Sequence, residues 1–140
     1  MKSFKLILAL TLVLTITLLS SCSKDDDPIL SRLELLTQKP WKLKSTTIVG
    51  IGSSPPESTS ADDLHTFNAD GTYLFDEGPT KEDSSDPQTV NGKWEFAEAE
   101  TIIKLSYGGL TLNQEIVELS SSTLKVKFNF IFDLEETFGH

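Results

Sequence analysis

The chain has 140 residues, enough for one domain, and a formal net charge of −9 from 12 Lys and Arg against 21 Asp and Glu. An acidic balance of this size argues against nucleic acid or anionic lipid headgroups as electrostatic partners, because phosphate binding needs Lys and Arg gathered on one face. A single cysteine excludes an internal disulfide.

Residues 1–21 have the pattern of a secretory signal peptide. Lys2 and Lys5 form a short positive region, residues 6–19 are almost entirely apolar, and small residues precede Cys22. Removing this segment leaves 10 Lys and Arg against 21 Asp and Glu, a charge of −11. Because a bilayer-spanning helix needs roughly 20 apolar residues, the apolar run is short for a transmembrane anchor.

The residues around the cysteine resemble the bacterial lipobox. The resemblance implies that Leu19, Ser20 and Ser21 are the signal peptidase recognition site, and that the cysteine after them is diacylated on sulfur and becomes the new N-terminus. The alternative is an ordinary signal peptide followed by a chance cysteine, but the chain has no other cysteine. Two or three acyl chains hold a protein firmly on a membrane, whereas one is marginal. We therefore expect acyl chains on Cys22 to attach the protein to a membrane without spanning it.

Residues 22–28 form an acidic tether in this interpretation. Neighbouring carboxylates repel each other and stay solvated, which predicts a flexible spacer. Lys24, Asp25, Asp26 and Asp27 also resemble the signal that directs some Gram-negative lipoproteins to the outer face of the outer membrane. We expect a cell-surface location there, with the periplasmic face as the alternative. A calcium loop would need staggered ligands and a turn glycine, which this run lacks.

Residues 29–140 remain for a single domain. Apolar residues recur every three or four positions from Ile29 to Leu36, which predicts a short amphipathic helix over residues 29–37 that flanks or plugs the end of a sheet. Lys39 and Pro40 end it, because the residue before a proline is pushed out of the helical region.

Stretches typical of β-strands fill the rest of the chain. Asn68 to Gly71 predicts a tight hairpin, since glycine takes a positive φ without strain and Asp70 can bond its own backbone. Two polar loops, residues 50–63 and 76–89, would share one rim of a barrel and could meet a protein partner. The expected strands cover 41–49, 64–67, 72–75, 90–96, 101–107, 110–119 and 123–134.

The last of these stretches alternates most strictly, with one apolar exception at Ile131. Such alternation predicts a strand with one buried face and one wet face. We expect seven strands, or eight if a long one is broken by a bulge. The fold class is then all-β, an antiparallel up-and-down meander that closes as a barrel or a flattened sandwich. The apolar positions on the buried face are Leu124, Val126, Phe128, Phe130, Phe132 and Leu134.

The sequence resembles the lipocalin-like domains of small bacterial lipoproteins, over roughly residues 33–134. The motifs that carry the resemblance are Trp41-Lys42-Leu43, Phe67-x-x-Asp70-Gly71-Thr72-Tyr73, Gly92-x-Trp94 and Ile116-x-x-Leu119-x-x-x-x-Leu124-x-Val126. Lipocalins usually place a glycine before the first tryptophan, where this chain has Lys39-Pro40. The resemblance implies a lipocalin-like barrel with a small apolar ligand in its mouth and no assigned reaction.

Aromatic residues are the candidates for the barrel interior. They would line a ligand site or simply fill the core of a small barrel, which needs no cavity at all. These residues are Trp41, Phe67, Tyr73, Phe75, Trp94, Phe128, Phe130 and Phe132.

No residue pattern indicates catalysis. His65 lies near two loop carboxylates but lacks the further ligand and spacing of a zinc site, and His140 is terminal and expected to be mobile. The acid pairs Glu98/Glu100 and Glu135/Glu136 are most simply solvated. We therefore expect no enzyme activity, no cofactor and no metal.

Two functions remain open from the sequence. The first is a lipid-anchored envelope protein of a Gram-negative bacterium that binds a small apolar or amphipathic ligand, or a glycan, in a β-barrel. The second is a surface interaction protein, adhesin or accessory subunit with a filled barrel. A pocket of several hundred cubic ångströms at one rim would favour the first, and an exposed apolar patch on the loops the second.

Overall fold

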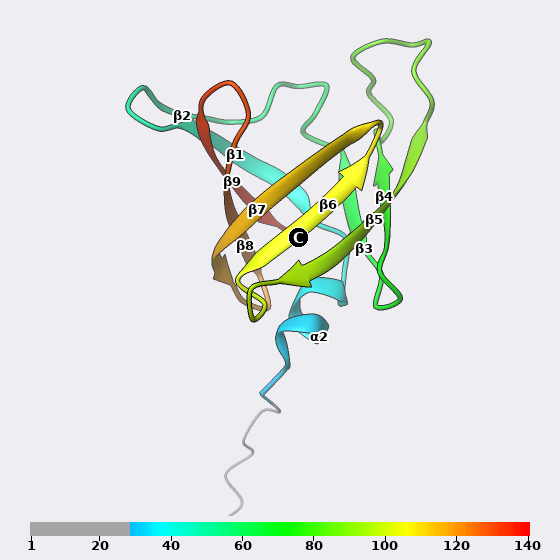
Figure 1. Ribbon diagram of the computed structural model, residues 1–140. Helices are drawn as coiled ribbons and strands as arrows, with labels where there is room; N and C mark the ends of the chain where they lie inside the picture. Colours follow the sequence, from blue (N-terminus) through cyan, green and yellow to red (C-terminus); the bar gives the residue numbers. More distant parts are fainter. Residues whose placement is uncertain (1–28) are drawn as a thin grey trace, which may run out of the picture.

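A curled antiparallel sheet dominates the computed structural model, which describes residues 29–140 (Figure 1). Its nine strands lie in the order β2-β1-β9-β8-β7-β6-β5-β4-β3, which confirms the predicted all-β meander. The predicted signal peptide, Cys22 and the acidic tether lie outside the described residues. The strands are β1 (Lys42–Ile48), β2 (Gly52–Ser54), β3 (Leu64–Phe67), β4 (Thr72–Asp76), β5 (Thr89–Ala97), β6 (Ile102–Tyr107), β7 (Leu110–Leu119), β8 (Thr123–Asn129) and β9 (Asp133–Gly139).

The sheet curls into a flattened barrel. The first strand of the chain, β1, pairs with the last, β9, from Lys42 opposite Gly139 to Ile48 opposite Leu134. On its other side, β1 reaches β3 through a single bridge between Trp41 and His65. The backbone N–H of Trp41 donates to the His65 carbonyl at 2.8 Å, and that of His65 donates to the Trp41 carbonyl at 2.9 Å. These two backbone hydrogen bonds join the start of β1 to β3, at the place where a closed barrel would have a full ladder of hydrogen bonds.

The predicted number of strands was wrong. The stretch after β1, expected to be a polar loop over residues 50–63, contributes the short edge strand β2. The predicted strand over residues 123–134 is two strands, β8 and β9, joined by a turn over residues 130–132 rather than broken by a bulge. The Asn129 side-chain amide donates to the Asp133 carboxylate at 2.8 Å across the base of this turn.

The hairpin between β3 and β4 forms where it was predicted. Gly71 has a φ of +83°, and Asp70 Oδ1 accepts from the Thr72 backbone at 2.9 Å. Trp94 fixes the hairpin to β5, because its backbone N–H donates to the Gly71 carbonyl and its indole N–H to the Asn68 carbonyl, both at 2.9 Å. The Asp-Gly turn and the Gly-x-Trp motif are therefore one structural unit.

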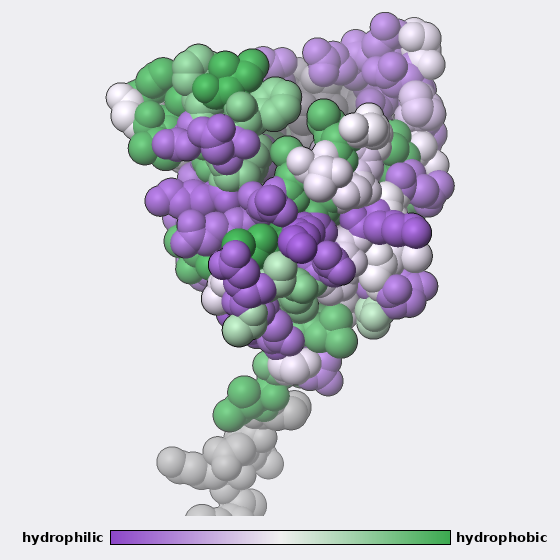
Figure 2. Space-filling view, viewed as in Figure 1, coloured by the Kyte–Doolittle hydropathy of each residue, from purple (hydrophilic) through white to green (hydrophobic). Residues whose placement is uncertain are grey.

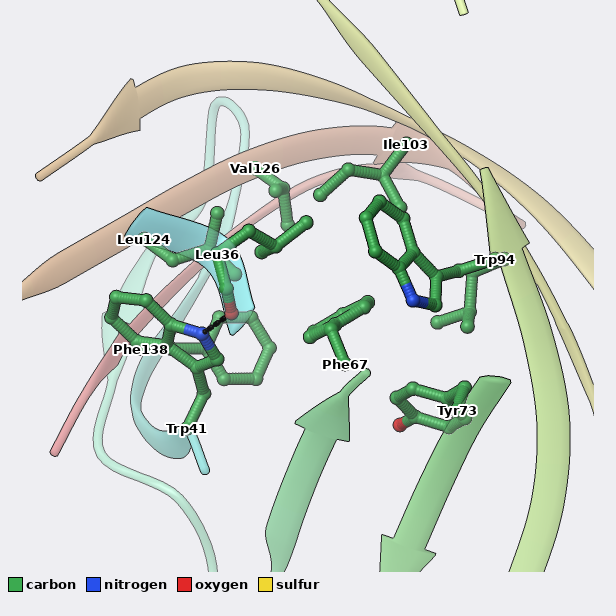
Figure 3. Close-up of a cluster of buried hydrophobic side chains, with 10 residues drawn as sticks. Leu36, Trp41, Phe67, Tyr73, Trp94, Ile103, Leu124, Val126 and Phe138 are labelled. Atoms are coloured by element: carbon green, nitrogen blue, oxygen red, sulfur yellow. Dashed lines mark hydrogen bonds between the residues drawn. The ribbon is translucent and has the colours of Figure 1, made fainter. Parts of the chain in front are cut away.

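Helix α2 (Arg32–Thr37) covers one end of the barrel and is shorter than the predicted helix (Figure 1). It begins after Ser31, whose side chain and that of Glu34 cap it reciprocally, and this capping box fixes its start. Leu36 is fully buried. Its carbonyl accepts the indole N–H of Trp41 at 2.9 Å, so the helix plugs the end of the sheet as expected (Figure 3).

Aromatic and aliphatic side chains from most of the strands fill the interior behind the helix (Figure 3). The Phe67 ring lies edge-on to Trp94 at 5.6 Å and tilted against Tyr73 at 5.2 Å between ring centroids. Edge-on and tilted contacts of this kind stabilise a pair of aromatic rings by more than the burial of their surface alone. The buried cluster comprises Leu36, Trp41, Phe67, Tyr73, Trp94, Ile103, Leu105, Leu124, Val126 and Phe138.

Candidate ligand-binding cavity

A cavity of about 340 Å³ lies inside the barrel. Its walls are the inward side chains of alternate positions on the curled sheet, and its floor is the outer layer of the buried core. It reaches the end away from α2, where the β6–β7 and β8–β9 turns lie (Figure 1). The lining residues are Leu43, Asp63, His65, Phe67, Phe75, Leu105, Tyr107, Leu110, Leu112, Gln114, Leu124, Phe128, Phe130, Leu134, Glu136 and Phe138.

The structure divides the eight aromatic candidates between the buried core, the cavity wall and the exposed turn between β8 and β9. Trp41, Tyr73 and Trp94 lie in the buried core, and Phe67 lies between the core and the cavity. Phe75 and Phe128 line the cavity.

Two of the aromatic candidates are not interior residues. Phe130 lines only the mouth of the cavity and is 57% exposed. Phe132 does not line the cavity and is 56% exposed, so its expected interior position was wrong. Both residues belong to the turn between β8 and β9, where the strand alternation ends.

The two polar loops meet at one rim, as predicted. Asp62 in the first loop accepts hydrogen bonds from the backbone N–H and the hydroxyl of Thr80 in the second. The same hydroxyl donates to the Ser58 carbonyl at 3.3 Å. These bonds hold the two loops together beside the mouth, next to Asp63.

His65 lies inside the barrel against aromatic rings rather than in a metal site. Its ring centroid is 5.1 Å from that of Phe138 and 5.3 Å from that of Phe75, and its Nδ1 lies 2.6 Å from the Tyr73 hydroxyl, within hydrogen-bond distance. Burial lowers the pKa of His65 to about 4 and raises that of Tyr73 well above its ordinary value. Both groups are therefore neutral at physiological pH.

Glu136 is a cavity residue that the sequence interpretation missed. The pair Glu135/Glu136 was expected to be solvated, yet only Glu135 faces outward, where its carboxylate pairs with Lys125 at 3.4 Å. Glu136 lines the cavity between Leu134 and Phe138 of the same strand, and burial raises its pKa to about 7. The alternation of these three residues was the available signal, but the strand had been ended at residue 134.

Asp63 is the second acid of the cavity. Burial, together with the charges of Asp62, Glu77 and Asp76, raises the pKa of Asp63 to about 6. Its Oδ1 atom is buried and has no hydrogen-bond partner in the described part of the chain. The cavity therefore holds two carboxyl groups whose charge is suppressed by their surroundings.

The remaining candidate residues lie outside the cavity. His140, expected to be mobile, packs on Trp41 with ring centroids 4.1 Å apart, and its Nδ1 lies 2.9 Å from the Pro40 carbonyl oxygen. Glu98 and Glu100 are exposed in the β5–β6 turn, where the Glu100 carbonyl accepts from Arg32. Within residues 29–140, no three His, Cys, Asp or Glu side chains are grouped to hold a metal ion, and no helix is long and apolar enough to cross a membrane.

The meander, the helix at one end and the apolar cavity at the other define a lipocalin-like barrel. The family model described as "Lipocalin-like domain" matches residues 38–126, and the chain belongs to this family. A lipocalin-like protein from Bacteroides uniformis, solved by crystallography, is similar in fold, with a TM-score of 0.57 and 12% sequence identity over 75% of this chain and 97% of that one. A search of curated proteins gave no match.

Proposed function

We propose that this protein binds a small apolar or amphipathic ligand in the barrel cavity. The observation that carries the proposal is the cavity itself, because about 340 Å³ lies in the range of small-molecule sites, roughly 300–1,000 Å³. Its lining is mainly Leu and Phe side chains with a small number of polar groups, which is the usual chemistry of such sites. This lining favours an apolar ligand over a glycan.

A cavity-filling substitution tests the proposal. Leu112→Trp would place an indole in the cavity, whereas Thr111→Trp, the matched control, adds the same group one residue away on the outward face of β7. We expect the first variant to lose binding of the neutral apolar dye N-phenyl-1-naphthylamine, and the second to bind it like the unaltered protein. Equal binding by both variants, measured by dye fluorescence with matched folding by circular dichroism, would place the dye outside the barrel.

We further propose that the mature protein is a lipoprotein of a Gram-negative outer membrane, facing the cell surface. The lipobox-like residues 19–21, Cys22 and the acidic run after it support this location. Cys22→Ala should move the protein from the membrane fraction to the soluble fraction, while Ser23→Ala, the neighbouring control, should not. Persistence of the Cys22 variant on envelopes would refute acylation. Removal of the unaltered protein from intact cells by added protease would support surface exposure, and full protection would place it on the periplasmic face.

A protein partner is the second candidate function, because the mouth of the cavity carries exposed apolar side chains. Apolar surface gathers over the β1–β2 hairpin and the β8–β9 turn (Figure 2), and contiguous patches of this kind often mark interaction sites. A photo-crosslinking residue at Ile131 should then trap a discrete adduct with a partner protein in cells. The same residue at Val117, which is also exposed, is the control and should trap none. This apolar rim comprises Val49, Ile51, Phe130, Ile131 and Phe132.

A further inference from the structure

Among the residues that the structure describes, the lining of the cavity carries acidic side chains and no basic side chain that is charged at neutral pH. Its two carboxyl groups, Asp63 and Glu136, are the lining side chains that can be charged near neutral pH, and the lining residues within the described range include neither Lys nor Arg. His65 is neutral there because burial lowers its pKa to about 4, and the pKa of Tyr107 is raised by burial and by the two acids. A ligand in this cavity therefore meets negative charge or no charge.

Lys125 and Lys127 flank Val126, the β8 residue that pairs with Glu136, and neither lysine lines the cavity. Lys125 on β8 pairs with Glu135, on the outward face of β9. Lys44, just after the lining residue Leu43, donates to the His140 carbonyl at 3.3 Å, near the end of the chain. The polar groups that share the cavity with Glu136 are Asp63 before β3, His65 on β3, Tyr107 on β6 and Gln114 on β7, with Tyr73 on β4 behind them.

Resting on the proposed binding function, we propose that the cavity selects an apolar molecule carrying an ammonium group, seated against Glu136 with Asp63 lining the same cavity, and rejects fatty carboxylates. An ammonium group would give the buried carboxyl groups the opposite charge that a buried ion requires. The Tyr107 and Phe138 rings beside them add aromatic faces, which attract cations. A fatty carboxylate would instead bring a like charge to a site without a cationic partner.

The ligand's charge couples to the protonation of the site. Burial raises the pKa of Glu136 to about 7, so the carboxyl group is largely protonated at pH 5 and largely ionised at pH 8. A quaternary ammonium compound keeps its charge at both values. Its affinity should therefore rise from pH 5 to pH 8, and this change reports the protein rather than the probe.

Three probes with an eight-carbon chain separate charge from apolar contact: octyltrimethylammonium, 1-octanol and octanoate, whose eighth carbon is the carboxyl carbon. Each competes with N-phenyl-1-naphthylamine for the protein from Ser23 onward, which contains every described strand and the whole core. At pH 8 we expect the ammonium compound to bind about tenfold more tightly than octanol, a difference of ~1.4 kcal/mol, with octanoate weakest.

The matched variants are Glu136→Gln and Glu135→Gln. The first keeps the side-chain shape and should reduce both the preference for ammonium and its dependence on pH to what Asp63 alone supplies, while octanol still binds. The second removes one charge from the outer face and should leave the preference intact. Octanoate binding as tightly as the ammonium compound, or an unchanged preference in Glu136→Gln, would overturn the inference while the binding function stands. Failure of the dye and of all three probes to bind would instead refute the binding function itself.

Discussion

Replacing Glu136 with glutamine should make the stability of the protein less dependent on pH. The pKa of Glu136 rises from the ordinary 4.5 to about 7 in the folded state because of burial. The folded state therefore holds this proton more tightly than the unfolded state does. Because of this difference, the contribution of Glu136 to the free energy of unfolding is fully present below pH 4.5 and is lost as the pH rises toward 7.

The magnitude comes from the same displacement. At about 1.4 kcal/mol for each pH unit, a rise from 4.5 to about 7 corresponds to roughly 3 kcal/mol of unfolding free energy. Glu136→Gln removes this titration. Any fixed cost of burying the amide is the same at every pH, so the difference in unfolding free energy between variant and unaltered protein should move by up to ~3 kcal/mol in favour of the variant between pH 4.5 and pH 8.

Urea unfolding followed by tryptophan fluorescence at several pH values measures this difference. Glu135→Gln is the control, because Glu135 lies on the outer face of the same strand and pairs with Lys125. Asp63 titrates in the same direction in all of these proteins, and its contribution cancels to first order in the comparison. A difference between Glu136→Gln and the unaltered protein that stays constant from pH 4.5 to pH 8 would refute the buried, uncompensated position of this carboxyl group.

Three further substitutions test the packing around the barrel. Trp41→Phe removes the indole donor to the Leu36 carbonyl as well as part of the core, and should cost about 3 kcal/mol in urea unfolding; an unchanged midpoint would show that α2 does not depend on this bond. Gly92→Ala would put a methyl group 2.7 Å from the Tyr107 Cβ, so a loss of about 2 kcal/mol is expected from thermal unfolding, and a neutral result would contradict the close β5–β6 contact. Ser31→Ala removes the cap of α2 and should cost about 1 kcal/mol, an effect absent if the helix were held by packing alone.

Local chemistry explains which parts of the fold could be predicted. The hairpin at Asp70-Gly71 is set by residues within the turn, and the alternation of β8 is set by residues two apart, so both can be recognised from short stretches. The turn over residues 130–132 was missed because Phe130 and Phe132 continue the apolar alternation of β8. Asn129 and Asp133, whose side chains bond across the turn, were the local signal.

The cavity could not be predicted by the same reasoning. Its volume depends on how far side chains from opposite strands reach into the barrel, which no local pattern records. The acid site was missed because the expected strand ended at residue 134. In the structure β9 continues to Gly139, so Glu136 falls between the inward residues Leu134 and Phe138. Asp63, from a loop far away in the sequence, reaches the same cavity because the β3 edge of the sheet comes back to β1.

Native mass spectrometry of the protein from Ser23 onward, exported to a Gram-negative periplasm and purified without detergent, tests the central claim most directly. We expect a fraction of the molecules to carry one small-molecule adduct that N-phenyl-1-naphthylamine displaces. The adduct should disappear in Leu112→Trp and persist in Thr111→Trp. A protein that carries no adduct and takes up no dye would contradict a ligand-binding barrel, as would an adduct that survives when the cavity is filled.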